Sequence, residues 1–179
     1  MIRFEEDTGK IELMKSKNDH KINEYRKKIE IFRTRYSDFI ELPTTQYEHE
    51  EYDKEWAETF KDKVGFPLTD SYLWFLNTYI GGYICGDEIY SIYCKEFESL
   101  PGGDIAFQYF NTRDNFPEIH SMIKNGLVVF ETGFDETFYF NYDDYDGSEC
   151  SIWLLDRGEH EYFTSNFYEF LIKYIQLCI

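Results

Sequence analysis

The chain has 179 residues, of which 20% are aromatic, and it carries 35 Asp/Glu against 18 Lys/Arg, for a formal net charge of −17. This length suits a single domain with a hydrophobic core of its own. Such a charge repels phosphate backbones and anionic membranes, which argues against nucleic-acid binding and membrane binding, whereas it attracts basic proteins.

The negative charge is concentrated in the larger part of the chain. Residues 1–40 contain 10 Lys/Arg and 8 Asp/Glu, whereas residues 41–179 contain 8 Lys/Arg and 27 Asp/Glu. This charge either keeps the protein soluble or steers a basic partner, and composition leaves both interpretations open. The 16 Tyr and 17 Phe predict a large aromatic core together with a Tyr-rich recognition surface.

The cysteines and the hydropathy pattern predict a cytoplasmic protein. Cys85, Cys94, Cys150 and Cys178 form no CxxC pair and no Cys/His spacing typical of zinc sites. The N-terminal segment has no apolar stretch of the signal-peptide type, and no run of about 18 apolar residues predicts a transmembrane helix. Free thiols in a reducing compartment are the simplest interpretation.

An amphipathic helix is predicted from Asp19 to the Leu42-Pro43 break. Its apolar stripe recurs at steps of three and four residues and comprises Ile22, Tyr25, Ile29, Phe32, Tyr36 and Phe39. Residues 1–18 show no clear period and are interpreted as an arm or a short strand around Ile11–Met14. The helix would pack on its own domain or on a second chain, so we expect a monomer or a weak homodimer.

Two parts are therefore predicted, an N-terminal extension at residues 1–45 and a folded domain at residues 46–179. Apolar residues at helical spacing predict further helices at 52–64, 71–79 and 166–178. Weaker helical patterns cover 104–110 and 117–124, whereas 111–116 has the character of a loop. Thr69 or Asp70 would cap the second of the strong helices, and Asn166 with Glu169 the third.

Strands are predicted between these helices, where the apolar period changes to alternation. They cover residues 83–85, 88–94, 127–131, 137–142, 151–155 and 162–163. The order is helices, then hairpin-linked strands, then a closing helix. This order predicts an α+β fold with helices packed on a mostly antiparallel, meander-like β-sheet.

No sequence motif predicts catalysis. The four histidines are scattered among polar residues, and no nucleophile-elbow, zinc-protease or phosphate-loop motif occurs. In the acidic segment 141–149, a calcium loop with Gly147 at its sixth position would need ligands at Tyr142 and Trp153, which cannot serve. We therefore expect no enzyme, no metal and no cofactor, although paired carboxylates are common enough to leave an acid/base enzyme as the weakest alternative.

Three segments between about residues 52 and 177 share a distinctive order. The first, residues 66–82, runs from Phe66-Pro67 through a helix with Phe75-Leu76 to Gly81-Gly82. The others are the Gly-Asp-like turn at 133–135 and the closing segment 163–171. Together they resemble the SUKH superfamily of Smi/Knr-like proteins, except that Ile80 stands in place of the usual Asn. The resemblance implies an α+β fold without shared catalytic residues.

The resemblance also implies a role in protein binding. Many bacterial SUKH proteins resemble immunity proteins, which bind and neutralise a toxin, often a nuclease, and fungal relatives regulate cell-wall synthesis and signalling. We therefore expect a protein partner, a basic toxin domain, and keep a regulatory scaffold as the alternative. Charge and resemblance together predict that the partner contacts Asp143, Asp144, Tyr145, Asp146 and Glu149, with Glu159 and Glu161. For the acidic segment itself, a merely solvated hairpin tip is the other interpretation.

Overall fold

The computed structural model describes residues 3–44, 52, 54–79, 81–93, 97, 102–134 and 136–179. The helices are α1 (Arg3–Arg35), α2 (Lys54–Val64), α3 (Asp70–Thr78), α4 (Ile105–Asn115), α5 (Pro117–Met122) and α6 (Phe167–Cys178). The strands are β1 (Ile40–Glu41), β2 (Gly82–Ile84), β3 (Asp87–Ile89), β4 (Gly126–Glu131), β5 (Thr137–Asn141), β6 (Ser151–Asp156) and β7 (Glu159–Thr164), and a 3-10 turn, η1 (Tyr142–Asp144), follows β5.

The seven strands form one sheet in which each pairs with its neighbours in sequence order. Every pairing is antiparallel, from β1 with β2 through to β6 with β7. The predicted α+β fold with a meander-like sheet is therefore confirmed. Within the described part of the chain, no helix combines the length and the apolar character needed to cross a membrane.

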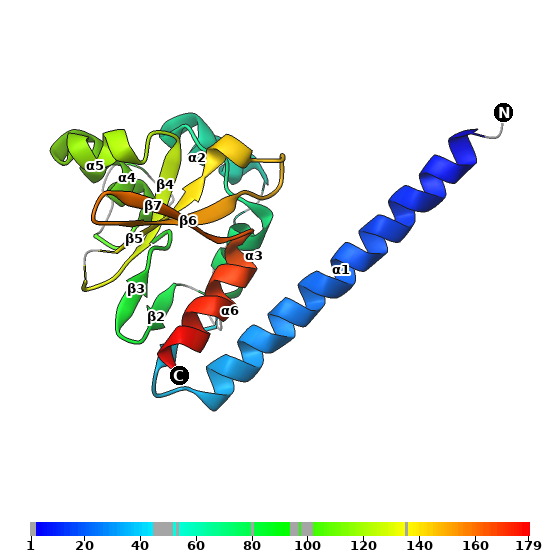
Figure 1. Ribbon diagram of the computed structural model, residues 1–179, viewed down its shortest axis with the longest axis horizontal. Helices are drawn as coiled ribbons and strands as arrows, with labels where there is room; N and C mark the ends of the chain where they lie inside the picture. Colours follow the sequence, from blue (N-terminus) through cyan, green and yellow to red (C-terminus); the bar gives the residue numbers. More distant parts are fainter. Residues whose placement is uncertain are drawn as a thin grey trace.

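The main core lies between one face of the sheet and helices α3 and α6, which lie side by side in Figure 1. Phe138 and Phe140 of β5 point to this face because side chains alternate along a strand. Phe167 and Phe170 of α6 share one side of their helix and pack against them, at ring-centroid distances of 5.9 Å for Phe140–Phe167 and 5.4 Å for Phe138–Phe170. On the opposite face, Ile123 at the end of α5 and Tyr139 both border Gly126.

The caps predicted for two helices are present. Thr69 accepts a hydrogen bond from the Tyr72 amide at the start of α3, and Asn166 accepts one from the Glu169 amide at the start of α6. The Glu169 carboxylate accepts a hydrogen bond from Ser165 Oγ instead of from the Asn166 amide, so the capping box is shifted by one residue.

Helix α1 differs from its prediction. The interpretation of residues 1–18 as an arm or a short strand at Ile11–Met14 is wrong, because α1 begins at Arg3. Its first half lacks an apolar period, but it is rich in Glu, Lys and Leu/Met, which favour helix by propensity alone. Figure 1 shows this half leading away from the rest of the molecule. The predicted domain boundary between residues 45 and 46 lies outside the described residues.

The second half of α1 packs on α6 of the same chain. The rings of Tyr25 and Tyr168 stack with centroids 6.0 Å apart. The Tyr25 hydroxyl donates to the Glu169 carboxylate, and Arg26 Nη2 donates to the Tyr168 hydroxyl over 2.8 Å. The predicted apolar stripe of this helix therefore packs on the helix's own chain. Self-association through the remainder of α1 stays a prediction.

Three shorter elements also differ from their predictions. Helix α4 continues to Asn115, so the loop predicted at 111–116 is wrong. Strand β3 stops at Ile89 instead of Cys94, because the chain turns to form a parallel bridge between Ser91 and Asp104. Strand β7 spans six residues where only residues 162–163 were expected, since the polar Glu159–Glu161 segment pairs with β6 despite its low apolar content.

The Gly81-Gly82 pair has a structural cause. Both residues have positive φ, +126° and +148°. A Cβ on Gly82 would overlap the Glu41 carbonyl oxygen and lie 2.8 Å from Leu42 Cδ2. Glycine at position 82 therefore allows β1 to pair with β2 and close this edge of the sheet.

We predict that Gly82→Ala lowers the free energy of unfolding by about 2–5 kcal/mol, because backbone strain and a collision with β1 act together. Gly86→Ala is the matched control, since Gly86 also has positive φ, +89°, but an added Cβ there meets nothing within 4 Å. It should cost only about 1–2 kcal/mol. Urea unfolding of both variants measures the difference, and equal losses would contradict the role assigned to β1.

Candidate protein-binding surface

Five of the seven predicted contact residues, from Asp143 to Glu149, lie in the segment between β5 and β6, and hydrogen bonds of the carboxylates in this segment hold it in place. Asp143 Oδ1 accepts from Asn125 Nδ2 over 2.9 Å, and Asp144 Oδ1 accepts from the Ser151 amide over 3.0 Å. Asp146 Oδ1 accepts from the amides of Ser148 and Glu149, both over 2.8 Å, and these bonds lower the pKa of Asp146. The three aspartates are exposed. We call Asp143, Asp144 and Asp146 the acidic loop.

The segment carrying the acidic loop is docked on α3 and on the residues before it. The Tyr142 hydroxyl donates to the Pro67 carbonyl over 2.6 Å, and the rings of Tyr142 and Phe66 stack at 4.6 Å. The Asp70 amide donates to the Ser148 carbonyl over 2.9 Å. Tyr145 is half-buried beside Tyr142, at 5.8 Å between ring centroids. The acidic loop is thus presented from a fixed base.

Glu149 is part of that base. Its carboxylate accepts from the Ser71 amide over 2.8 Å and from Ser71 Oγ over 2.6 Å, at the first turn of α3. Burial raises the pKa of Glu149 to about 7, outweighing the opposite effect of the two bonds from Ser71. Both carboxylate oxygens are engaged inside the molecule, so Glu149 supports the acidic loop instead of extending it.

Glu159 and Glu161 lie apart from the acidic loop. On β7, Glu161 is opposite Leu154 and Glu159 is opposite Asp156, whereas the acidic loop joins β6 at its other end. Ser151 and Asp156 are five residue steps apart along β6, roughly 17 Å. Glu161 also shares a face with Leu154 and Phe138, on the α6 side of the sheet. The structure therefore divides the predicted set between two places.

An aromatic surface borders the acidic loop on the opposite face of the sheet. Tyr139, Trp153 and Tyr162 are cross-strand neighbours on β5, β6 and β7. Trp153 meets Tyr162 edge to face at 6.2 Å, and its Nε1 donates to Ser151 Oγ over 2.8 Å. The Tyr139 hydroxyl and His160 Nδ1 are 2.8 Å apart. Tyr139 itself is buried beneath these side chains, at 6% exposure. We use the name aromatic surface for Met122, Trp153, His160 and Tyr162.

The aromatic surface and the acidic loop are continuous. A hollow of about 240 Å³ is lined by Tyr139, Trp153 and His160 together with Asp143, and Lys124 adds one positive charge at its rim. Tyr162 is 52% exposed and Met122 48% exposed, both high values for such side chains. The alternation of side chains along a strand shows which residues share a face with Trp153 or with Tyr162, but it does not show which face of the sheet is exposed to solvent. The sequence analysis therefore did not include these two residues in the predicted contact set.

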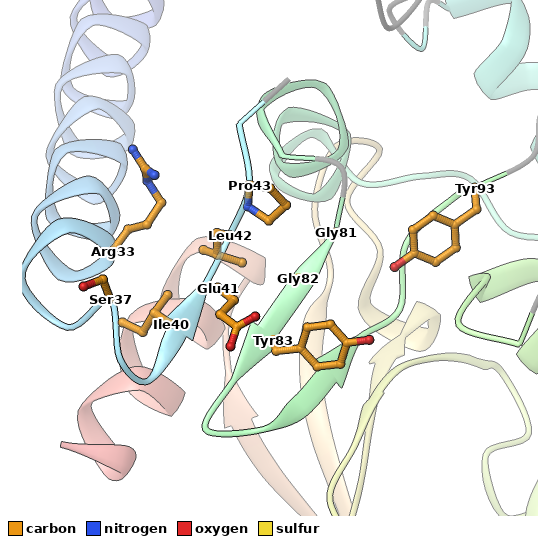
Figure 2. A pocket seen from close by; sticks show the side chains of 10 residues that line it. All are labelled: Arg33, Ser37, Ile40, Glu41, Leu42, Pro43, Gly81, Gly82, Tyr83 and Tyr93. Carbon is orange, nitrogen blue, oxygen red and sulfur yellow. The ribbon is translucent and has the colours of Figure 1, made fainter. Parts of the chain in front are cut away.

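A second hollow, of about 430 Å³, lies at the β1 edge of the sheet. Figure 2 shows Arg33 and Ser37 on one side of this hollow and Tyr83 and Tyr93 on the other, with β1 and the Gly81-Gly82 backbone between them. Arg33 is engaged by Glu30, with Nη2 and Oε2 2.9 Å apart, and the Tyr93 hydroxyl donates to Glu88 over 3.0 Å. This groove is mainly apolar and lacks the concentration of exposed carboxylates that the acidic loop places beside the aromatic surface.

Comparison with known families agrees with this architecture. A family model, SUKH_6, described as SMI1-KNR4 cell-wall, matches residues 54–171. The chain belongs to the SUKH superfamily. Comparison with curated proteins gives no match. The matched region runs from the start of α2 into α6, so this SMI1/KNR4-like module includes both the acidic loop and the aromatic surface, whereas α1 and β1 precede it.

We predict a pH-dependent contribution of Glu149 to stability. Its folded pKa of about 7 lies above the ordinary value of 4.5, so the native state binds the extra proton between these pH values. The contribution is therefore fully present below about pH 4.5 and is lost as pH rises through 7. Glu149→Gln removes it, and the stability difference between wild type and variant should change by on the order of 2–3 kcal/mol.

Urea unfolding of both proteins at several pH values between 4.5 and 7.5 measures this difference. The other carboxylates titrate alike in wild type and variant, so their effects cancel in the difference. A difference that is constant with pH, or that changes in the opposite direction, would contradict the buried position of the Glu149 carboxylate.

Proposed function

We propose that this SUKH module is a non-catalytic immunity-type protein that binds and neutralises a basic toxin domain, and that it does so by covering the partner's surface. The observation that carries the proposal is the exposed aromatic surface bordered by the acidic loop. A surface of this kind combines anchors for protein contact with charges that attract a basic partner.

The aromatic surface supplies the binding energy in this proposal. Tyr and Trp dominate interface hot spots because they bury a large area at low entropic cost. Trp153 is held by Ser151, and His160 is held by the buried Tyr139, so Trp153 and His160 are already ordered before binding. Tyr162 and Met122 lie exposed beside them. Ordering before binding reduces the free-energy cost of association.

The acidic loop supplies attraction and orientation. Residues 41–179 contain 27 Asp/Glu and 8 Lys/Arg, so the field around the domain accelerates encounters with a basic protein. The same field disfavours nucleic acid and anionic membranes as partners. Glu159 and Glu161, exposed on the edge strand β7, add to the field at a distance from the loop. Charged side chains on an edge strand also discourage aggregation through strand pairing.

A regulatory scaffold is the second candidate function, favoured by the family description as SMI1-KNR4 cell-wall. Such a scaffold would use the same surface for several partners of modest affinity instead of one tight partner. An enzyme is the weakest candidate. It would need a perturbed carboxyl free to react, whereas Glu149, whose pKa is raised, has both oxygens engaged by Ser71.

Affinity capture from a lysate of the source organism tests the function. We expect one stoichiometric basic partner that is released as salt is raised, because the attraction of exposed charges is screened. The purified chain should then inhibit the activity of that partner. Several weak partners would favour the scaffold, and capture of a partner whose activity is unaffected would contradict the immunity role.

A pair of matched double variants tests the surface. Asp143→Lys with Tyr162→Ala changes the acidic loop and the aromatic surface, and we expect it to weaken binding of the captured partner about tenfold or more. Asp38→Lys with Tyr83→Ala makes the same chemical changes at exposed positions near the β1 edge. The control should bind within about threefold of wild type. Equal losses, or a larger loss in the control, would show that the partner binds elsewhere.

A further inference from the structure

Two cysteines that are distant in sequence meet at the β1 edge of the sheet. Cys85 is exposed in the turn between β2 and β3, and Cys178 is the last residue of α6. Both line one hollow of about 420 Å³ together with Tyr83 and Asp38, and the neighbouring Cys85 thiol helps burial to raise the pKa of Cys178. Cys85 is exposed and Cys178 only partly buried, so small thiol reagents can reach the pair.

The packing of α6 holds this geometry. Tyr174 lies four residues before Cys178 and therefore on the same side of the helix. Its hydroxyl donates to Asp87 Oδ2 over 3.2 Å, which fixes this side of α6 to the β2–β3 turn. The Cys85 amide donates to the Phe39 carbonyl over 2.7 Å, which fixes the turn from the other direction. The two thiols are thus brought together by contacts that do not involve sulfur.

Cys85 also has an unusual backbone conformation. The two-residue turn places Cys85 at φ +56° and Gly86 at φ +89°. Turns of this type favour Asn, Asp or Gly at the first position, and a non-glycine residue there is strained. Cysteine at this position is not explained by the turn itself. A thiol placed next to Cys178 gives the position a chemical reason.

We propose that Cys85 and Cys178 form a reversible dithiol–disulfide site whose oxidant is a low-molecular-weight disulfide. The Cys85 thiolate attacks one sulfur of the small disulfide, forms a mixed disulfide and releases one small thiol. The Cys178 thiolate then attacks the Cys85 sulfur and releases the second small thiol. The protein loses two electrons and two protons, and the small disulfide becomes two thiols.

The difference in exposure sets this order. Cys85 is the more accessible thiol and therefore reacts first, whereas burial and the neighbouring Cys85 thiol raise the pKa of Cys178 to about 12 and disfavour a first attack by Cys178. Cys150 is buried, and burial raises the pKa of its thiol above the normal range, so it should remain inert. The cross-link would fasten the end of α6 to the β2–β3 turn, away from the aromatic surface.

Oxidised glutathione with the purified full chain tests the proposal. Peptide mapping by mass spectrometry should find a peptide pair joined through Cys85 and Cys178, with the loss of two hydrogens, and urea unfolding should shift to higher midpoint. In Cys178→Ser the reaction should stop at a glutathione adduct on Cys85. Cys85→Asn keeps a residue suited to positive φ, should fold at least as well as the reduced wild type, and should leave Cys178 unmodified.

Adducts on both cysteines of the wild type without the joined peptide would overturn the proposal, as would a cross-link made mainly through Cys94. The proposal would also be overturned if Cys178→Ser accumulated no more glutathione adduct on Cys85 than the wild type does. Cys178 would then play no part in displacing glutathione from Cys85.

Discussion

The packing of α6 against β4 and β5 is the constraint on which the other features depend. The Phe170 ring lies 5.7 Å from Phe130 and 5.4 Å from Phe138, and Phe167 lies 5.9 Å from Phe140. Because side chains alternate along a strand, turning Phe138 and Phe140 toward α6 turns Tyr139 to the other face. Register then carries Trp153 and Tyr162 to that face as well, and the aromatic surface results.

The same constraint fixes the acidic loop. Phe75 of α3 packs on Phe167 of α6 at 5.2 Å, so α3 is held in place relative to the sheet. The segment after β5 is in turn bonded to this helix through Ser71 and Glu149. Core packing, helix capping and the presented carboxylates therefore form one connected structure, and a binding surface built this way loses little freedom when a partner arrives.

Elements with a strong period could be predicted from the sequence, and elements specified by long-range pairing could not. The stripes and caps of α3 and α6 are local signals, and so is the alternation of β5. The first half of α1 has no stripe, and β7 begins with polar residues that form a strand only because β6 lies beside them. The exposed aspartates were predictable from charge, whereas the inward position of Glu149 depends on Ser71, 78 residues away.

Amide hydrogen exchange of the chain, alone and bound to its captured partner, tests the central claim that this SUKH module recognises a protein through its aromatic surface and acidic loop. The account predicts added protection on binding in residues 142–150 and 159–164, with residues 81–86 unchanged. Protection confined to residues 36–44 and 81–86 would place the partner in the groove at the β1 edge and contradict the account.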